Sequence, residues 1–289
     1  MNIRIKRGFA FLLTGVMMLL LPAAASGMPS VQAEEKTVTV NLDIGEEILY
    51  GSYHTRSYTV DGQTAYCLEP LKPWPASGRY EAQRLEGGDL RKAFYYIYGG
   101  PGYDTYVEKY GYFGFSGKMV KTDEYCMSHC IAAYFYLGTN DAFTGVSADQ
   151  ADALKQKAEK IRTLPDPPEY FNAFIFKTSG NQQAIGGTGK NLTGSVEIYK
   201  KSQQPEWTEN NACYSLEGAV FGLFESGKNT PSYRIVTDRN GYGRADNVRL
   251  GSYEIRELES PEGFTLNPDR KRITVKENTV STASCSDAP

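Results

Sequence analysis

Histidine is nearly absent from this sequence, which contains only His54 and His129. So small a number argues against a histidine-rich metal site. Basic residues are not in excess either, because 31 lysines and arginines stand against 34 aspartates and glutamates. A protein that binds nucleic acid through a basic patch is therefore not expected. The apolar fraction of 40% in turn argues against a disordered chain.

Long apolar runs are also scarce, and the only one lies in residues 9–25. A basic stretch without acidic residues precedes it, and small residues up to Ala33 follow it. This pattern predicts a secretory signal peptide over residues 1–33 and a mature protein that begins at Glu34. An uncleaved membrane anchor is the alternative. Removal of the signal takes three basic residues with it, so the net charge falls from −3 to −6 and no membrane span is expected to remain.

Cysteine is sparse and odd in number, and an odd count in an exported protein raises the question of which thiol is free for chemistry. The grouping of Cys126, His129 and Cys130 suggests a metal motif. Three ligands within five residues of one helix do not converge easily on a tetrahedral site, so we expect no metal and no cofactor. The pairing of the cysteines other than Cys67 stays open: Cys126, Cys130, Cys213 and Cys285.

The sequence pattern changes near residue 190, and we predict one domain over residues 34–190 and another over residues 191–289. The first mixes strands and helices, as an α+β domain does. A capping box formed by Ser147 and Gln150 marks the start of its last helix. Residues 103–122 show no clear period and are expected to form a loop, and residues 180–194 are expected to form a linker. The predicted strands are residues 37–42, 50–60 and 170–177, and the predicted helices are residues 90–98, 124–137 and 147–162.

The second domain consists of short apolar segments at regular spacing, without a helical period. This is typical of a β-sandwich. The predicted strands are residues 194–201, 215–225, 233–238, 251–258 and 272–275.

Three segments of the second domain carry a resemblance to a known family. They read GSVEIYK in residues 194–200, LEGAVFGL in residues 216–223 and GSYEIRELESPEGF in residues 251–264. They resemble the collagen-adhesin B-type domain, also called SpaA-type or prealbumin-like, of Gram-positive surface proteins and pilins. The resemblance covers almost all of residues 194–289 and implies an all-β, prealbumin-like (Ig-like) sandwich.

Domains of that family often contain an intramolecular isopeptide bond. The resemblance assigns its lysine to Lys200, its catalytic glutamate to Glu257 and its acceptor to Asp287 on the last strand. Lys201 is a second candidate, although strand alternation would point it outward. Burial lowers the pKa of a lysine and raises that of a carboxyl group, so a neutral amine can attack a protonated acid. A protonated Glu257 would polarise the acceptor carbonyl.

The first domain carries a second resemblance, in Tyr66-Cys67-Leu68-Glu69-Pro70, in the helix around residues 128–134, and in QQAIG of residues 182–186. Together these resemble the thioester domain of Gram-positive adhesins over residues 41–190. The resemblance implies a thioester between Cys67 and Gln182, with Gln183 as the second candidate. The thiol would attack the carboxamide and release ammonia, and nearby aromatic side chains would shield the product from water.

His129 is a departure from that family, in which a Thr-Gln pair stands where this chain has Ser128 and His129, and a tryptophan follows. It also opens a rival interpretation. Cys67 and His129 together resemble the thiolate–imidazolium dyad of papain-like peptidases and transglutaminases. No peptidase signature surrounds Cys67, so His129 is retained as a candidate helper without a bond-forming role.

The expected function is that of a secreted adhesin or pilin-tip protein of the Gram-positive cell surface and cell wall. It would capture an amine-bearing ligand in a single turnover, so it is not expected to be an enzyme. The expected partner is a host or surface protein that offers a lysine amine, with other pilin subunits as further partners. The alternatives are a Cys–His enzyme and a purely structural pilin subunit. No Leu-Pro-x-Thr-Gly sorting motif is present, so we expect either a longer chain or partners that hold the protein at the wall.

Overall fold

The computed structural model describes residues 37–50, 52–178 and 180–289. The predicted signal peptide and its cleavage site after Ala33 lie outside these residues. Within the described ranges, no helix combines the length and the apolar character needed to cross a membrane.

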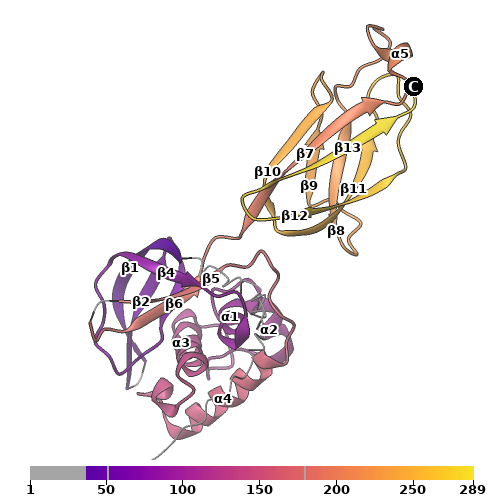
Figure 1. Cartoon of the computed structure of the whole chain (residues 1–289). Helices are drawn as coiled ribbons and strands as arrows, with labels where there is room; N and C mark the ends of the chain where they lie inside the picture. The colour runs from indigo at the N-terminus through magenta and orange to yellow at the C-terminus, as the bar shows by residue number, and fades with distance from the viewer. Residues whose placement is uncertain (1–36, 51, 179) are drawn as a thin grey trace, which may run out of the picture. The chain divides into compact units, whose positions relative to one another are not determined.

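The first domain contains a closed barrel of antiparallel strands in the order β1-β2-β3-β6-β5-β4 (Figure 1). Successive residues of β3 point to opposite faces. Ala65 and Cys67 therefore pack in the apolar barrel interior, whereas Tyr66 and Leu68 pack in the core formed with the helices. The strands are β1 (Thr37–Tyr50), β2 (Tyr53–Val60), β3 (Gln63–Cys67), β4 (Gly78–Arg84), β5 (Ala173–Lys177) and β6 (Ala184–Thr188).

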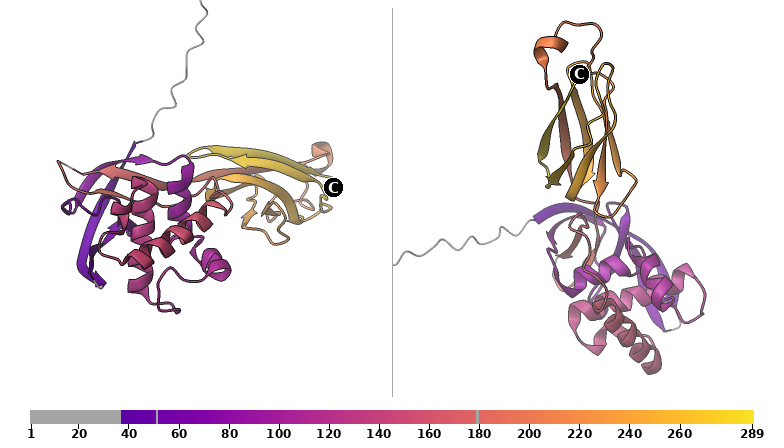
Figure 2. Two further views of the ribbon diagram at one scale, coloured as in Figure 1. Left: turned by 90° about the horizontal axis from the view of Figure 1, so that it is seen from below. Right: turned by 90° about the vertical axis from the view of Figure 1, so that its right-hand side faces the viewer.

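The helices of this domain gather on one side of the barrel (Figures 1 and 2). α3 is the most deeply placed, because every residue from Glu124 to Ala133 is buried. The predicted capping box at the start of α4 is confirmed: Ser147 Oγ accepts from the backbone N–H of Gln150, and the Gln150 side chain accepts from the backbone N–H of Ser147. The helices are α1 (Gly88–Tyr96), α2 (Tyr103–Tyr110), α3 (Lys121–Leu137), the 3₁₀ helix η1 (Asn140–Phe143) and α4 (Ala148–Arg162).

Two predictions for this domain are wrong. Residues 103–122 were expected to be a loop, but α2 lies there; it is one of the short helices that tertiary packing stabilises, here through the buried Tyr106. Residues 180–194 were expected to be a linker, but they include β6, whose five residues are all buried. The glycines of β6 are needed for close packing, because a Cβ on Gly187 would lie 2.6 Å from the backbone oxygen of Thr64.

The second domain is a sandwich of two sheets, which confirms its predicted fold class. One sheet has the order β10-β7-β13, and the other has the order β12-β11-β8-β9. β7 and β13 pair in parallel, with Cys285 opposite Lys200. β10 and α5 were not predicted. The elements are β7 (Thr193–Ser202), α5 (Pro205–Thr208), β8 (Val220–Glu225), β9 (Tyr233–Val236), β10 (Tyr242–Arg249), β11 (Gly251–Glu259), β12 (Arg270–Val275) and β13 (Val280–Asp287).

Candidate functional site

Cys67 ends β3 inside the barrel, with its side chain buried. Its partner across the β3–β6 pair is Ile185, and the backbone N–H of Leu68 donates to the carbonyl of Ala184. Gln183 lies two residues before Ile185, directly before the first residue of β6.

Gln183 is buried, and both ends of its carboxamide are held. The hydroxyl of Tyr58 donates a 3.0 Å hydrogen bond to Oε1, and Nε2 donates a 2.9 Å hydrogen bond to the backbone carbonyl of Lys72. A backbone carbonyl only accepts hydrogen bonds, so it fixes which end of the amide carries the nitrogen. Gln182, the first candidate from the sequence, is only partly buried. Tyr58 packs in the same cluster of the barrel interior as Cys67, so its hydrogen bond links the carboxamide of Gln183, the second candidate, to that cluster.

The Cys67 thiol is uncharged in this environment. Burial raises its pKa to about 12, while a hydrogen bond from the backbone of Glu69 partly opposes the shift. The same Glu69 accepts from the backbone N–H of Ala184 at 2.9 Å, so it also ties the segment after Cys67 to β6. A neutral thiol lacks the thiolate character of a fast nucleophilic cysteine.

His129 lies on α3 beside this site and is buried among four tyrosine rings. Its Nδ1 lies 3.1 Å from the hydroxyl oxygen of Thr55. Burial lowers its pKa to about 3, and the nearby backbone of Cys67 opposes that shift. A thiolate–imidazolium pair needs a low thiol pKa and a raised histidine pKa, and here both pKa values move the other way. The directions of these two pKa shifts therefore do not favour the rival dyad interpretation.

Because His129 is buried and neutral, we expect the first domain to lose stability in mild acid. Between pH 6.5 and about pH 3 the unfolded chain binds a proton at this residue and the folded chain does not, so stability falls as the pH falls. The expected loss is about 2 kcal/mol at pH 5. Urea unfolding of the mature protein at pH 7 and pH 5 measures it, and His129→Gln should reduce the difference.

The exposed His54 supplies the control, because His54→Gln should leave the acid dependence as it is in the wild type. An NMR titration of the His129 ring provides a check that does not depend on how well the variants fold. A His129 ring that takes up a proton above pH 5.5 in the folded protein would contradict the account.

The other predicted residues meet in the core of the second domain. Lys200 of β7, Glu257 of β11 and Asp287 of β13 all have fully or almost fully buried side chains. Lys200 Nζ donates a 2.7 Å hydrogen bond to Glu257 Oε1 and also contacts Asp287 Oδ2. The second oxygen of Glu257 accepts from the backbone N–H of Asn267 at 2.8 Å. The three side chains thus form a closed cluster that joins the two sheets.

This cluster is unusual for an ordinary ion pair. Both carboxyl oxygens of Asp287 are buried, and apart from the contact with Lys200 neither has a hydrogen-bond partner among the described residues. Burial also lowers the pKa of Lys200, and the hydrogen bond to Glu257 opposes that shift. Lys201, the second candidate, is exposed. The arrangement places an amine of lowered pKa directly against a carboxyl group, the two groups that amide formation joins.

The cysteines other than Cys67 take no part in these two clusters as bridges. All five cysteines are free, with Cys213 exposed and Cys285 buried. Among the described residues, no group of three or more His, Cys, Asp or Glu side chains is placed to hold a metal ion.

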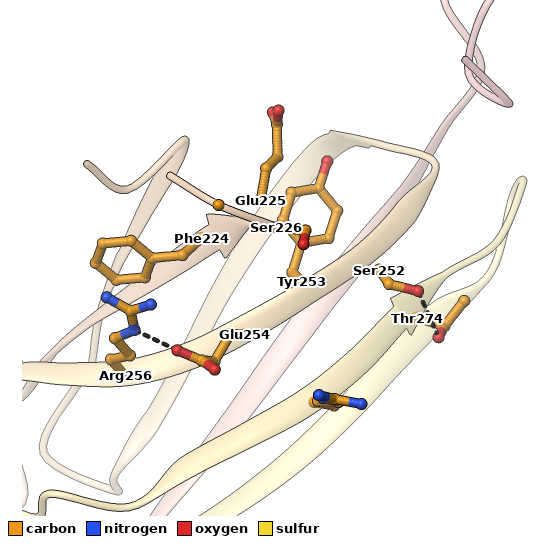
Figure 3. Close-up of a pocket in the computed structure, with 10 residues that line it drawn as sticks. Phe224, Glu225, Ser226, Ser252, Tyr253, Glu254, Arg256 and Thr274 are labelled. Carbon is orange, nitrogen blue, oxygen red and sulfur yellow. Dashed lines mark hydrogen bonds and ion pairs between the residues drawn. The ribbon is translucent and has the colours of Figure 1, made fainter. Parts of the chain in front are cut away.

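A separate hollow of about 400 Å³ lies on the sheet of the second domain, and Figure 3 shows it. Arg256 crosses it, 4.1 Å from the centre of the Phe224 ring and paired with Glu254. None of the candidate site residues named from the sequence lines this hollow.

Comparison with known proteins matches two parts of the chain to known families. Residues 39–168 match the family described as a thioester domain, and residues 194–289 match the SpaA family, described as a prealbumin-like fold domain. Among curated proteins, the trypsin-resistant surface T6 protein of Streptococcus pyogenes serotype M6 is 36% identical over 59 residues, which are 20% of this chain and 11% of that protein. The chain thus matches only about a tenth of the length of this relative.

Solved structures that align with parts of the chain include two from Bacillus. The TIE protein of Bacillus anthracis aligns with a TM-score of 0.37 and 13% identity, over 87% of this chain and 66% of that one. BcpA, the major pilin subunit of Bacillus cereus, aligns with a TM-score of 0.29 and 19% identity, over 41% of this chain and 38% of that one. On the family matches, the chain contains a thioester domain followed by a SpaA prealbumin-like domain.

Proposed function

We propose that this protein is a surface adhesin or pilin component that captures an amine-bearing partner through an internal thioester between Cys67 and Gln183. The observation that carries the proposal is the buried Gln183 carboxamide, which is held at both ends and bonded to Tyr58, a residue that packs in the barrel interior with Cys67. The thioester-domain match and the SpaA match support a role at the surface of a Gram-positive cell.

The proposed chemistry has two steps. In the first, the Cys67 sulfur attacks the Gln183 amide carbon, the C–N bond breaks, and the thiol proton leaves with the nitrogen as ammonia. In the second, an amine attacks the thioester carbon, an amide forms on Gln183, and Cys67 regains its proton. The second step happens once for each molecule, so the protein is a single-turnover reagent and not an enzyme with repeated cycles.

The partner in this proposal is a host or surface protein that presents a lysine amine, and other pilin subunits are further partners. The second domain acts as the stalk that displays the thioester domain outside the cell. Its Lys200, Glu257 and Asp287 cluster is proposed to form a Lys200–Asp287 amide with loss of one water, while Glu257 moves the proton. Such a cross-link would join the first and last strands of the domain.

Adjacent glutamines make a matched test of the thioester. Wild-type mature protein should be one ammonia lighter at this site than its sequence requires, and Gln182→Glu should keep that deficit. Gln183→Glu should lose it, since a carboxylate does not expel ammonia and is a poor acyl donor. Intact-mass spectrometry of freshly prepared protein reads out all three. A mass deficit that persists in Gln183→Glu and disappears in Gln182→Glu would show that Gln182 forms the thioester. Wild-type protein without the deficit would contradict the thioester itself.

A further inference from the structure

Tyr58 contacts the oxygen of the amide that is proposed to react. Its hydroxyl, on β2, lies 3.0 Å from Gln183 Oε1, and its ring is buried in the barrel interior together with Cys67. Burial raises the pKa of Tyr58, and the proximity of Cys67 raises it further, so the phenol keeps its proton. The Tyr58 hydroxyl therefore stays protonated and donates its hydrogen bond to Gln183 Oε1, the oxygen of the proposed acyl group. It is also close enough to Cys67 for that residue to raise its pKa.

The position of this hydroxyl is fixed by its surroundings. The backbone N–H of Tyr58 donates to the hydroxyl of Tyr125 at 3.0 Å, and Tyr125 in turn donates to backbone carbonyls of Arg56 and Ala65. The Tyr58 ring also packs edge-on against His129, with ring centres 6.0 Å apart. A donor held in this way needs no rearrangement when negative charge develops on the oxygen it contacts.

The nitrogen side of the amide has an equally defined partner. Gln183 Nε2 donates to the backbone carbonyl of Lys72, and the backbone N–H of Gln183 donates to the carbonyl of Pro73. When ammonia leaves, the Lys72 carbonyl loses its donor while the Pro73 contact remains. Attack by an amine is the reverse of that departure, so the incoming nitrogen enters where Nε2 was and its N–H can restore the bond to Lys72.

From this geometry we propose that Tyr58 is a catalytic residue of the thioester and that the Lys72 carbonyl selects primary amines as its substrates. The inference rests on the proposed Cys67–Gln183 thioester. Tyr58 stabilises the oxyanion of the tetrahedral intermediate in both steps. A primary amine leaves one N–H on the product amide for Lys72, whereas a secondary amine leaves none and strands a partly buried acceptor.

Tyr58→Phe tests the first half. It removes one oxygen and one donor, and loss of one such donor slows acyl transfer by about a hundredfold or more in comparable sites. The rate of ammonia loss should fall by about that factor when protein recovered unfolded in urea, before any thioester has formed, is refolded and followed by intact mass. Tyr66→Phe is the matched control, because Tyr66 is equally buried but its hydroxyl donates to the carbonyl of Tyr98 and not to Gln183. Equal rates in wild type and Tyr58→Phe would overturn the catalytic role.

Ethylamine and dimethylamine test the second half, because they are isomers and differ in whether the nitrogen is primary or secondary. The preference is the rate with ethylamine divided by the rate with dimethylamine. On the wild-type thioester this ratio should be at least about tenfold larger than on a small-molecule thioester in the same buffer. An unchanged preference would overturn the selection by Lys72. Both tests require the wild-type ammonia deficit to be present, so a failure of the thioester itself is seen first and separately.

Discussion

Lys200→Ala is expected to produce the largest loss of stability of any single substitution in the second domain. The proposed Lys200–Asp287 amide would close a loop that includes nearly the whole domain, since β7 is its first strand and β13 its last. By analogy with a disulfide that closes a loop of similar length, the amide should contribute about 4 kcal/mol to the free energy of unfolding. For a domain of this size, its loss should lower the Tm by roughly 20 °C.

The mass of each variant shows whether the stability change comes from the covalent bond. Lys200→Ala removes the amine and should abolish the loss of one water. Glu257→Ala should leave the fold recognisable but also abolish that loss, since no acid then polarises Asp287. The exposed neighbour provides the control, because Lys201→Ala should keep both the mass deficit and the Tm. Free Lys200 and free Asp287 in a tryptic map of folded wild-type protein would show that the domain is an uncross-linked sandwich.

Cys67→Ala is expected to abolish covalent capture completely. Without the sulfur no thioester forms, so the variant should have no ammonia deficit and should not react with methylamine. Wild-type protein should gain one methylamine at Gln183 and expose one new thiol, which a thiol reagent detects. The effect is all or none because an unactivated carboxamide does not react with amines on the same time scale.

Substitution of a cysteine elsewhere in the chain is the control for nonspecific thiol reactivity. Cys213 is exposed and free, and Cys213→Ala should leave the methylamine reaction unchanged. Cys126→Ala is a second control from the buried cysteines of α3. Methylamine incorporation that persists in Cys67→Ala would contradict the assignment of Cys67.

Much of the architecture follows from local sequence rules. The capping box at Ser147 and Gln150 predicts the start of α4 correctly, because its two hydrogen bonds depend only on residues three apart. The strands with alternating apolar residues, such as β2 and β11, were also predicted. β6 and α2 were not, because their signals are tertiary: glycine in β6 permits close strand packing, and α2 depends on the burial of Tyr106.

The candidate sites were predictable to different degrees. The cluster of Lys200, Glu257 and Asp287 could be named because each residue lies in a recognisable sequence segment, and the structure brings all three together. The choice between Gln182 and Gln183 was open, because both are glutamines in the same sequence segment. Only the burial and contacts of their side chains distinguish them, and these are not visible in the sequence. Tyr58 and the Lys72 carbonyl could not be found at all. Tyr58 is one of 21 tyrosines, and a backbone carbonyl has no sequence signature.

The intact mass of the secreted protein, measured before and after methylamine, tests the central claim most directly. The account predicts a mass lower than that of the mature sequence by one ammonia and one water. Methylamine should then add the mass of one methylamine, and the water deficit should stay because an isopeptide amide does not react. A fresh preparation whose mass equals that of its sequence, and which methylamine does not change, would contradict both the thioester and the cross-link.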